Sequence, residues 1–600
     1  MTSHSTAAGN RAGTIYIMAM GTSLIVVCLA VAGLQSVRVQ RRINESQSQI
    51  ANAKKLAQAG IEFAQLSMSS DVSWRTKFMH GVPVTRATTG GSFSVVLMDP
   101  DDGVISNQTT DPITITSTGA FGASSQKITA YLEPQNTLYA ACRSSLYATR
   151  EINFDNCTVT SNQWAYCGLT FIKIGNPTVN MNCLSTRSNP IDNVSTQRFV
   201  VGGVWPMAQP DMVPTSSGYV GRYYIDNSVA ISASDLPTGG TELLKNGGFE
   251  ADTANWTSLG CTLTRDTTQK RTGLASCLVS GRTSVLTTPI QNITEHMLKG
   301  RSYTVSVWVR PVEAQDFRIT ISCYGTGSLL ASVSSGNAVS VNAGVWTQVS
   351  QSIIPAWSGA LTKAEFQIES SKLSSYHLDD ASLLNADRVA GTRYIENILL
   401  SDTSNPFGNG ALSTNGLYSI HVPGENLVIR DSRINATIVV TDSIKTELRS
   451  AISWEPIGRN FPALISTETI WDNTTSNSLS ESTIGVNLNH SSTPYAGNSD
   501  LDANDNYLNP SSTPYAGNSD LDENDNYPTV IAGAILSNRD ILLDGVSTLS
   551  GPVMSNQTIT VKSSSLSINF PSDMILNPPP GFFPDPPPMR LIPSSVQSVP

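Results

Sequence analysis

The chain has 600 residues, enough for roughly three to five domains, and its 37 Lys and Arg face 47 Asp and Glu, for a formal charge of −10. An acidic chain has no net attraction to phosphate backbones, so the composition argues against nucleic acid as a partner. Charged residues make up only 14% and hydrophobic residues 40%, which excludes global disorder and is typical of exported, β-rich proteins.

A single segment, residues 14–34 (TIYIMAMGTSLIVVCLAVAGL), is long and apolar enough to cross a bilayer. It carries no charge, and apolar residues continue beyond it at i, i+3 and i+4 spacings. The sequence therefore predicts a leader over 1–13, a transmembrane helix over 14–35 and an amphipathic helix over 36–70. A cleaved signal peptide is the alternative, although its apolar core is usually about 7–15 residues long.

Two signals conflict on which side of the membrane the bulk of the chain lies. Five cations follow the apolar segment, and the positive-inside rule would keep that side in the cytoplasm: Arg38, Arg41, Arg42, Lys54 and Lys55. Seven of the eight cysteines lie beyond the segment, in a part of the chain with secreted-type composition. We give the second signal more weight and predict a single-pass membrane protein with an exported, periplasmic or cell-surface bulk.

The N-terminal region, roughly residues 10–134, carries runs that resemble a known group. The helix ends in LAQAGIEFAQ, and GGSFSVVLMDPDDGVISNQ and ITSTGAFGASSQKITAYLEP follow. This order is similar to the type IV pilin-like proteins, especially PilX-like minor pilins and the large minor pseudopilin of type II secretion. The resemblance implies a small β-sheet over 82–134 and other pilin-like subunits as partners. Met18 stands where pilin helices usually carry Glu, and a plain signal-anchor helix is the alternative.

Beyond residue 82 short β-rich runs alternate with Gly, Asn, Asp and Ser turns. The run that begins at Gly533 aligns with the run that begins at Gly551, at an offset of 18 residues, with Ile541 matching Ile559. Such a period fits one coil of a β-solenoid. We predict a mainly β protein with a β-solenoid (β-helix) over 135–241 and 385–576. A sandwich of hairpins is the alternative.

Residues 242–384 differ in texture from the solenoid on both sides. They contain ELLKNGGFEADTANW, RSYTVSVWVRP and SSYHLDDASLL, in this order. These runs resemble the family 4/9 carbohydrate-binding modules, which are β-jelly rolls. The resemblance implies an inserted jelly roll, a polysaccharide ligand, and a structural calcium near Glu250, Asp379 and Asp380. Solvated turn carboxylates are the alternative for these three residues.

Strand alternation within the module predicts a sugar-binding face. Between Ser302 and Arg310 one face is apolar, and Trp308 and Arg310 share the other. We expect Trp308 to stack on a sugar ring, while Arg310 and Gln367 supply hydrogen bonds from the same concave sheet. The alternative is that Trp308 packs under a neighbouring loop.

A tandem repeat and a Pro-rich tail complete the chain. SSTPYAGNSDLDANDNY (491–507) recurs at 511–527 with one difference, and each copy holds a D-x-D-x-N run. Oxygen ligands at alternate positions suit calcium, and a polar turn is the alternative. The hypothesised ligands are Asp500, Asp502, Asn504, Asp520, Asp522 and Asn524. Residues 577–600 form the tail, for which a polyproline-type segment is expected.

Cysteine spacing suggests disulfides in an exported protein. Cys142, Cys157, Cys167 and Cys183 could form two disulfides, and Cys261 and Cys277 flank a predicted hairpin. A zinc site is the alternative for the first four, although their spacings of 15, 10 and 16 residues include no close pair.

No HExxH, GxSxG, Walker loop, GxGxxG or CxxC motif is present. We therefore predict a membrane-anchored bacterial surface protein that binds polysaccharide without catalysis. The alternatives are a glycan-degrading enzyme with its active site on the solenoid and a structural pilin-like subunit of a secretion or pilus apparatus. Three or more acidic residues gathered in a solenoid groove would favour the enzyme.

Overall fold

The computed structural model describes residues 12–71, 73–107, 111–135, 138–185, 199–201, 209–216, 218–325, 330–357, 361–458, 460–488, 525–546, 548–583, 587 and 589–599. The chain divides into two compact units, Met1–Thr137 with Pro584–Pro600, and Leu138–Phe583. The prediction of a mainly β protein with a long apolar N-terminal helix is confirmed. The tandem repeat lies outside the described residues except for 525–527, and with it all six of its hypothesised calcium ligands.

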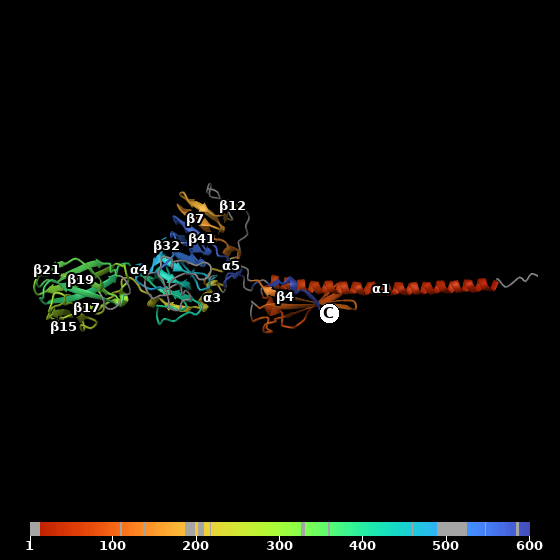
Figure 1. Ribbon diagram of the computed structural model, residues 1–600, viewed down its shortest axis with the longest axis horizontal. Coiled ribbons are helices and arrows are strands. Elements are labelled where there is room, and N and C mark those ends of the chain that lie inside the picture. Colours follow the sequence, from red (N-terminus) through yellow and green to blue (C-terminus); the bar gives the residue numbers. More distant parts are fainter. Residues whose placement is uncertain are drawn as a thin grey trace, which may run out of the picture. The chain divides into compact units, whose positions relative to one another are not determined.

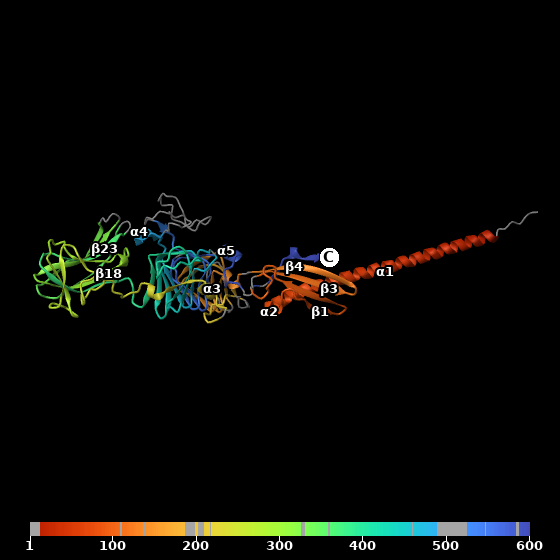
Figure 2. The same cartoon turned by 90° about the horizontal axis from the view of Figure 1, so that it is seen from below.

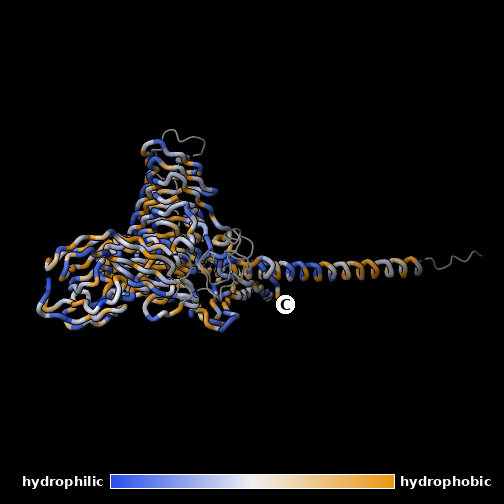
Figure 3. The backbone as a smooth tube through the Cα atoms, turned by 60° about the vertical axis from the view of Figure 1, so that its left-hand side comes forward, coloured by the Kyte–Doolittle hydropathy of each residue, from blue (hydrophilic) through white to orange (hydrophobic). Residues whose placement is uncertain are grey.

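The first unit is one long helix packed on an antiparallel sheet (Figure 1). Helix α1 (Ala12–Ser70) contains no proline, so its hydrogen-bond ladder is uninterrupted over 59 residues. Its apolar window is 0% buried, and it is long and apolar enough to cross a membrane. In Figure 3 the N-terminal end of the helix is mostly hydrophobic, whereas the stretch nearer the sheet is hydrophilic. The short helix α2 (Trp74–Lys77) follows.

The C-terminal part of α1 lies against the sheet through residues spaced three or four apart, Ala53, Ala57, Ile61, Ala64 and Met68. The sheet order is β1 (Val84–Thr88), β2 (Gly91–Met98), β3 (Ile113–Phe121) and β4 (Ser124–Pro134). A Cβ on Gly119 would lie 2.1 Å from the carbonyl oxygen of Ala53, so glycine there is what allows helix and sheet to approach closely.

Two C-terminal strands complete this sheet. β42 (Met589–Leu591) and β43 (Gln597–Val599) both pair antiparallel with β4. The Pro-rich sequence predicts a polyproline-type segment over 577–600 and does not indicate these two strands. Figure 2 shows this C-terminal segment beside β4.

The second unit contains three parallel curled faces that form a β-solenoid, as predicted (Figure 1). The first face contains β25 (Thr392–Glu396), the first halves of β28 (Asn426–Ile434) and β30 (Lys445–Trp454), β32 (Thr469–Thr474), β37 (Ile541–Leu543), β40 (Ile559–Val561), β6 (Glu151–Asp155) and β9 (Thr170–Ile174). The second contains β26 (Leu399–Leu400), the second halves of β28 and β30, β35 (Val530–Ala532), β38 (Thr548–Ser550), β41 (Leu566–Asn569), β7 (Thr158–Ser161) and β10 (Thr178–Asn180).

The third face contains β13 (Val229–Ser232), β27 (Leu417–His421), β29 (Thr437–Thr441), β31 (Leu464–Ser466), β36 (Ile535–Ser537), β39 (Val553–Ser555), β5 (Leu146–Ala148), β8 (Ala165–Cys167), β11 (Cys183–Ser185) and β12 (Phe199–Val201). The 18-residue period is one coil, because Ile541 lies in register with Ile559 and Ile535 with Val553. Inward side chains stack from coil to coil into one apolar core.

The coils do not follow chain order. The last coil of the C-terminal part, β39 to β41, pairs in parallel with β5 to β7 of the N-terminal part. Two segments cover the outer side of the third face. The first contributes Met212, Tyr219, Val220 and Tyr224, the last of these from helix α3 (Gly221–Asp226). The second contributes Phe570, Met574 and Phe582, of which Met574 lies in α5 (Ser572–Leu576). The Tyr224 hydroxyl donates to the Pro580 carbonyl at 3.0 Å, so the proline-rich run lies on the solenoid surface.

An antiparallel β-sandwich lies in the chain between β13 and β25. One layer, the β19 sheet, contains β14 (Thr257–Ser258), β17 (Pro289–Asn292), β23 (Lys363–Ser370), β19 (Gln315–Tyr324), β20 (Leu330–Ser335) and β21 (Val339–Val341). The other, the β18 sheet, contains β15 (Thr262–Asp266), β16 (Ser276–Ser280), β24 (Tyr376–Asn385), β18 (Tyr303–Pro311) and β22 (Thr347–Ile353). A small sheet of β33 (Leu479–Ser480) and β34 (Asn526–Tyr527), with helix α4 (Glu481–Ile484), lies elsewhere in this unit.

All eight cysteines are among the described residues, and none forms a disulfide. In the solenoid Cys183 is opposite Ala165, and Cys167 is opposite Ser185. The register of neighbouring coils therefore does not place Cys167 and Cys183 opposite each other. Cys277 is opposite Arg265 rather than Cys261. The expected disulfides are therefore absent, because spacing along the chain does not fix the strand register.

Candidate functional site

The outer face of the β19 sheet carries a row of polar side chains. The alternate residues Phe317, Ile319 and Ile321 of β19 and Phe366 and Ile368 of β23 fill the sandwich core. Strand alternation therefore turns their neighbours outward. The outward cross-strand pairs are Arg318 with Glu369, Thr320 with Gln367, Ser322 with Glu365, and Tyr324 with Lys363.

This face is hollowed. Although they point away from the core, Thr320, Glu365 and Gln367 are only 0%, 6% and 9% exposed. A pocket of about 270 Å³ lies at one end of the hollow, lined by residues that include Leu286, Arg318 and Glu369. Concave, largely preformed surfaces with a few fixed polar groups are where small ligands bind.

Glu365 is the centre of the polar network on this face. Its Oε2 accepts the Tyr324 hydroxyl at 3.0 Å and the Gln367 amide at 3.0 Å, and its Oε1 pairs with the Lys363 ammonium. Burial, together with the hydrogen bond to Glu365, raises the pKa of Tyr324. Beside them, Arg318 Nε donates to Glu369 at 2.6 Å. The side chains are thus held in place before any ligand arrives.

The arrangement can bind hydroxyl groups but does not match glycoside hydrolysis. Glu365 and Glu369 are four residues apart on one strand, or about 13 Å at roughly 3.3 Å per residue. The two carboxyl groups of a glycosidase are about 5–9.5 Å apart. Each of these two carboxylates also has a cationic partner. The face offers a half-buried tyrosine ring, an amide and fixed charges, which suits recognition rather than bond cleavage.

The structure separates the three sugar-binding residues expected from the sequence. Trp308 and Arg310 lie on the outer face of the β18 sheet, whereas Gln367 lies on the β19 sheet, so they do not share one sheet. The Arg271 guanidinium lies 3.8 Å from the centre of the Trp308 ring, and Arg310 Nε donates to the Gly344 carbonyl at 2.9 Å. One side of the Trp308 ring is therefore covered by the loop that carries Arg271. Alternation shows which residues face outward, but it does not show which layer a strand joins.

The residues that sequence reasoning missed are Tyr324, Lys363, Glu365 and Arg318. The signal that could have found them was the alternation in KAEFQIES, extended to its partner strand QDFRITISCY.

Glu250, Asp379 and Asp380 converge on the turn 271–274. Asp379 Oδ2 accepts the Arg271 and Thr272 amides at 2.8 and 3.2 Å, and Asp380 accepts the Thr272 hydroxyl at 2.7 Å. Glu250 accepts the Leu274 amide at 2.5 Å. Protein donors thus occupy these oxygens, and the three do not form a group with oxygens within 4.8 Å of one another. The residues clamp the turn themselves, and a calcium ion there stays a prediction.

A different group of carboxylates, Asp99, Asp102 and Asp111 of the first unit, has ligand oxygens within 4.8 Å of one another and could hold a metal ion. No comparable trio occurs in the described part of the solenoid. Two of its buried acids are ion-paired: Glu396 with Arg388 and Arg430, and Glu447 with Lys445 and Arg449.

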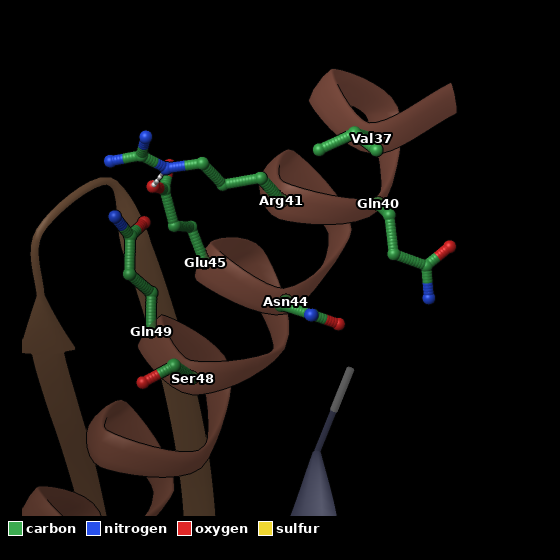
Figure 4. A pocket seen from close by; sticks show the side chains of 7 residues that line it. All are labelled: Val37, Gln40, Arg41, Asn44, Glu45, Ser48 and Gln49. Atoms are coloured by element: carbon green, nitrogen blue, oxygen red, sulfur yellow. Dashed lines mark hydrogen bonds and ion pairs between the residues drawn. The ribbon is translucent and has the colours of Figure 1, made fainter. Parts of the chain in front are cut away.

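A further hollow lies along the free part of α1, lined by residues between Val37 and Gln49 (Figure 4). It contains the exposed pair Arg41–Glu45, 2.9 Å apart at i, i+4. This ion pair stabilises the helix. The polar side chains that line this hollow do not point toward a common ligand position.

Comparison with known proteins identifies the sandwich. The profile of a family described as carbohydrate binding domain (CBM_4_9) matches residues 241–375. The solved structures similar to this chain include the CBM22-1 xylan-binding domain of Paenibacillus barcinonensis Xyn10C, at 20% identity over 26% of this chain and 99% of that one, with a TM-score of 0.22. They also include the C-terminal family 22 module of Clostridium thermocellum Xyn10B, at 16% identity over 25% and 97%, with a TM-score of 0.23. No curated protein matches the chain.

Proposed function

We propose that the protein is a membrane-anchored surface protein that binds a polysaccharide, without cleaving it, on the outer face of the β19 sheet. The observation that carries the proposal is the hollowed polar face itself, in which Glu365 and Gln367 are buried yet point away from the core. The family match over 241–375 supports a carbohydrate as the ligand class.

Each residue has a distinct role in this proposal. The Lys363 ammonium lies 5.2 Å from the centre of the Tyr324 ring, on one side of it. The opposite side of the ring stacks on the apolar face of a sugar, as aromatic rings do with flat apolar partners. The Gln367 amide and the Glu365 carboxylate exchange hydrogen bonds with hydroxyl groups. Because the network already holds these side chains, little conformational entropy is lost on binding.

The anchor rests on α1. Its apolar window is unburied, so nothing in the described part of the chain covers it. A lipid bilayer suits such a helix, because the apolar side chains contact lipid and the helix satisfies its own backbone hydrogen bonds. The part of α1 that directly follows the apolar window is also exposed, and it could pack against other pilin-like subunits.

Binding of the full-length protein in detergent to a glycan array, followed by titration with the best ligand, tests the proposal. Tyr324→Ala should weaken binding about tenfold, since a stacked ring contributes about 0.5–1.5 kcal/mol. Gln367→Ala should weaken it roughly 5- to 100-fold, because a hydrogen bond worth about 1–3 kcal/mol is lost.

The β18 sheet provides the matched controls. Gln348→Ala removes an exposed glutamine that lies opposite Trp308, and Trp308→Ala removes the indole itself. Both variants should bind like the wild type. Loss of binding in Trp308→Ala with normal binding in Gln367→Ala would move the site to the β18 sheet and overturn the proposal.

A further inference from the structure

The loop between β2 and β3 gathers three carboxylates at one end of the first unit's sheet. Asp99 directly follows β2, Asp111 lies two residues before β3, and Asp102 lies between them. β2 and β3 are antiparallel, with Met98 opposite Thr114, so the two ends of the loop meet. The ligand oxygens of all three residues lie within 4.8 Å of one another.

Two of these carboxylates are buried and only partly satisfied. Asp99 is 3% exposed and Asp111 is 7% exposed, and the Oδ2 atom of each has no hydrogen-bond partner. The other oxygen of Asp99 accepts the Asp101 amide at 2.9 Å. Asp102 accepts the Val104 amide at 2.8 Å. Buried carboxylate oxygens are normally paired, and none of the described residues supplies a hydrogen bond to these two Oδ2 atoms.

The nearby cation does not balance the cluster. Arg75 donates to the backbone carbonyls of Ile105, at 3.1 Å, and of Asp111, at 2.5 Å. Three carboxylates and one guanidinium leave two negative charges, which is the charge that one divalent cation neutralises.

We infer that Asp99, Asp102 and Asp111 bind a calcium ion that fastens the β2–β3 loop to the sheet. Carboxylate oxygens are the ligands of hard cations, and oxygens bound to one calcium at about 2.4 Å lie at most about 4.8 Å apart. Magnesium requires near-ideal octahedral geometry at about 2.0–2.1 Å, whereas calcium accepts irregular sets of six to eight oxygens. Arg75 also contacts the Met589 sulfur at 3.8 Å, so the ion would steady the corner where β42 joins the sheet.

Titration of the full-length protein with calcium, and with terbium as a luminescent substitute, tests this site. Trp74 is 2% exposed, and the Arg75 guanidinium lies 4.7 Å from its ring, so excitation of tryptophan should sensitise terbium bound here. Asp111→Asn and Asp99→Asn each remove one ligand charge without changing the shape of the side chain. Asp101→Asn, an exposed residue of the same loop, is the matched control.

We expect each ligand variant to bind one calcium equivalent fewer than the wild type and to lose the tryptophan-sensitised signal, while Asp101→Asn keeps both. Counting equivalents separates this site from any other calcium site of the chain. Calcium, relative to EDTA, should raise the melting temperature of the wild type more than that of Asp111→Asn. The melting curve of Asp111→Asn also shows whether this variant folds. Equal stoichiometry and an equal calcium-induced shift in wild type and Asp111→Asn would overturn the inference.

Discussion

A single buried carboxylate bonds to residues that precede and follow residues 489–524 in the chain. Glu481 is 0% exposed and accepts amide protons from Leu488, at 2.5 Å, and from Asp525, at 3.1 Å, the described residues on either side of 489–524. The Tyr527 hydroxyl donates to the same carboxylate at 3.1 Å. Burial, with Asp525 adding to it, raises the pKa of Glu481 to about 7.

Glu481 should therefore make this region less stable as the pH rises. The folded state keeps the proton up to about pH 7, whereas the unfolded chain releases it near 4.5, so the folded state binds more protons between these values. The free energy of unfolding should fall across that window by at most about 3 kcal/mol. Amide hydrogen exchange around Leu488 and Asp525, corrected for the intrinsic rate, should be slower at pH 5 than at pH 8.

Glu481→Gln should remove this dependence, because glutamine does not titrate. Glu313→Gln, at an exposed turn, is the control and should behave like the wild type. A pH dependence that persists in Glu481→Gln would assign it to another group.

At the scale of elements, the strand at the C-terminus of the chain completes the sheet of the N-terminal unit. Leu132 of β4 is opposite Leu591 of β42, and Ile128 is opposite Ser598 of β43. Met589 and Leu591 pack on the apolar core beneath the sheet. An unpaired β4 would expose backbone groups that seek a partner.

Truncation after Phe583 should selectively destabilise the first unit. It removes two packed apolar side chains and the backbone hydrogen bonds along β4. Together these losses should lower the free energy of unfolding of the first unit by about 2–4 kcal/mol. Limited proteolysis should then cut within 84–134 faster than in the wild type, while cleavage of the solenoid is unchanged. Truncation after Ser595 keeps β42 and should have a smaller effect. Equal protection in all three proteins would show that the added strands contribute nothing to stability.

At the scale of the second unit, the sandwich leaves and re-enters the solenoid at one place. Thr238 bridges Arg393, and the Tyr394 amide donates to the Pro237 carbonyl at 2.9 Å. Arg301 of the sandwich donates to Asn397 of the solenoid at 3.0 Å and pairs with Asp431. The two points at which the chain leaves and re-enters the solenoid are therefore adjacent. Side-chain hydrogen bonds and ion pairs from Arg301 also attach the sandwich to the solenoid.

Deleting residues 241–386 and bridging the gap with a short glycine linker should leave a folded solenoid. The adjacent ends need little chain to join, and the lost Arg301 contacts cost about 1–3 kcal/mol. Far-ultraviolet circular dichroism should keep its β signal, the melting temperature should fall by a few degrees, and glycan binding should disappear. An aggregated product would show that the solenoid needs the module in order to fold.

The local periodicities of this protein can be recognised in its amino-acid order alone. An uncharged stretch of apolar residues indicates a long helix, the offset between Ile541 and Ile559 indicates a coil, and alternation around Val307 separates core from surface. Each of these is a short-range pattern set by backbone geometry, so it can be predicted without knowing neighbours. The order of helix, solenoid and sandwich follows from them.

Which segments are neighbours became known from the folded chain. It paired β40 with β6 across some four hundred residues, added β42 to the sheet beside β4, and placed Gln367 and Trp308 on opposite layers. It also brought Asp99 and Asp111 together at one corner of a sheet. Backbone hydrogen bonds in a sheet join strands regardless of their distance along the chain, so register and layer depend on the packing of the whole chain. The candidate site on the β19 sheet is a product of that packing.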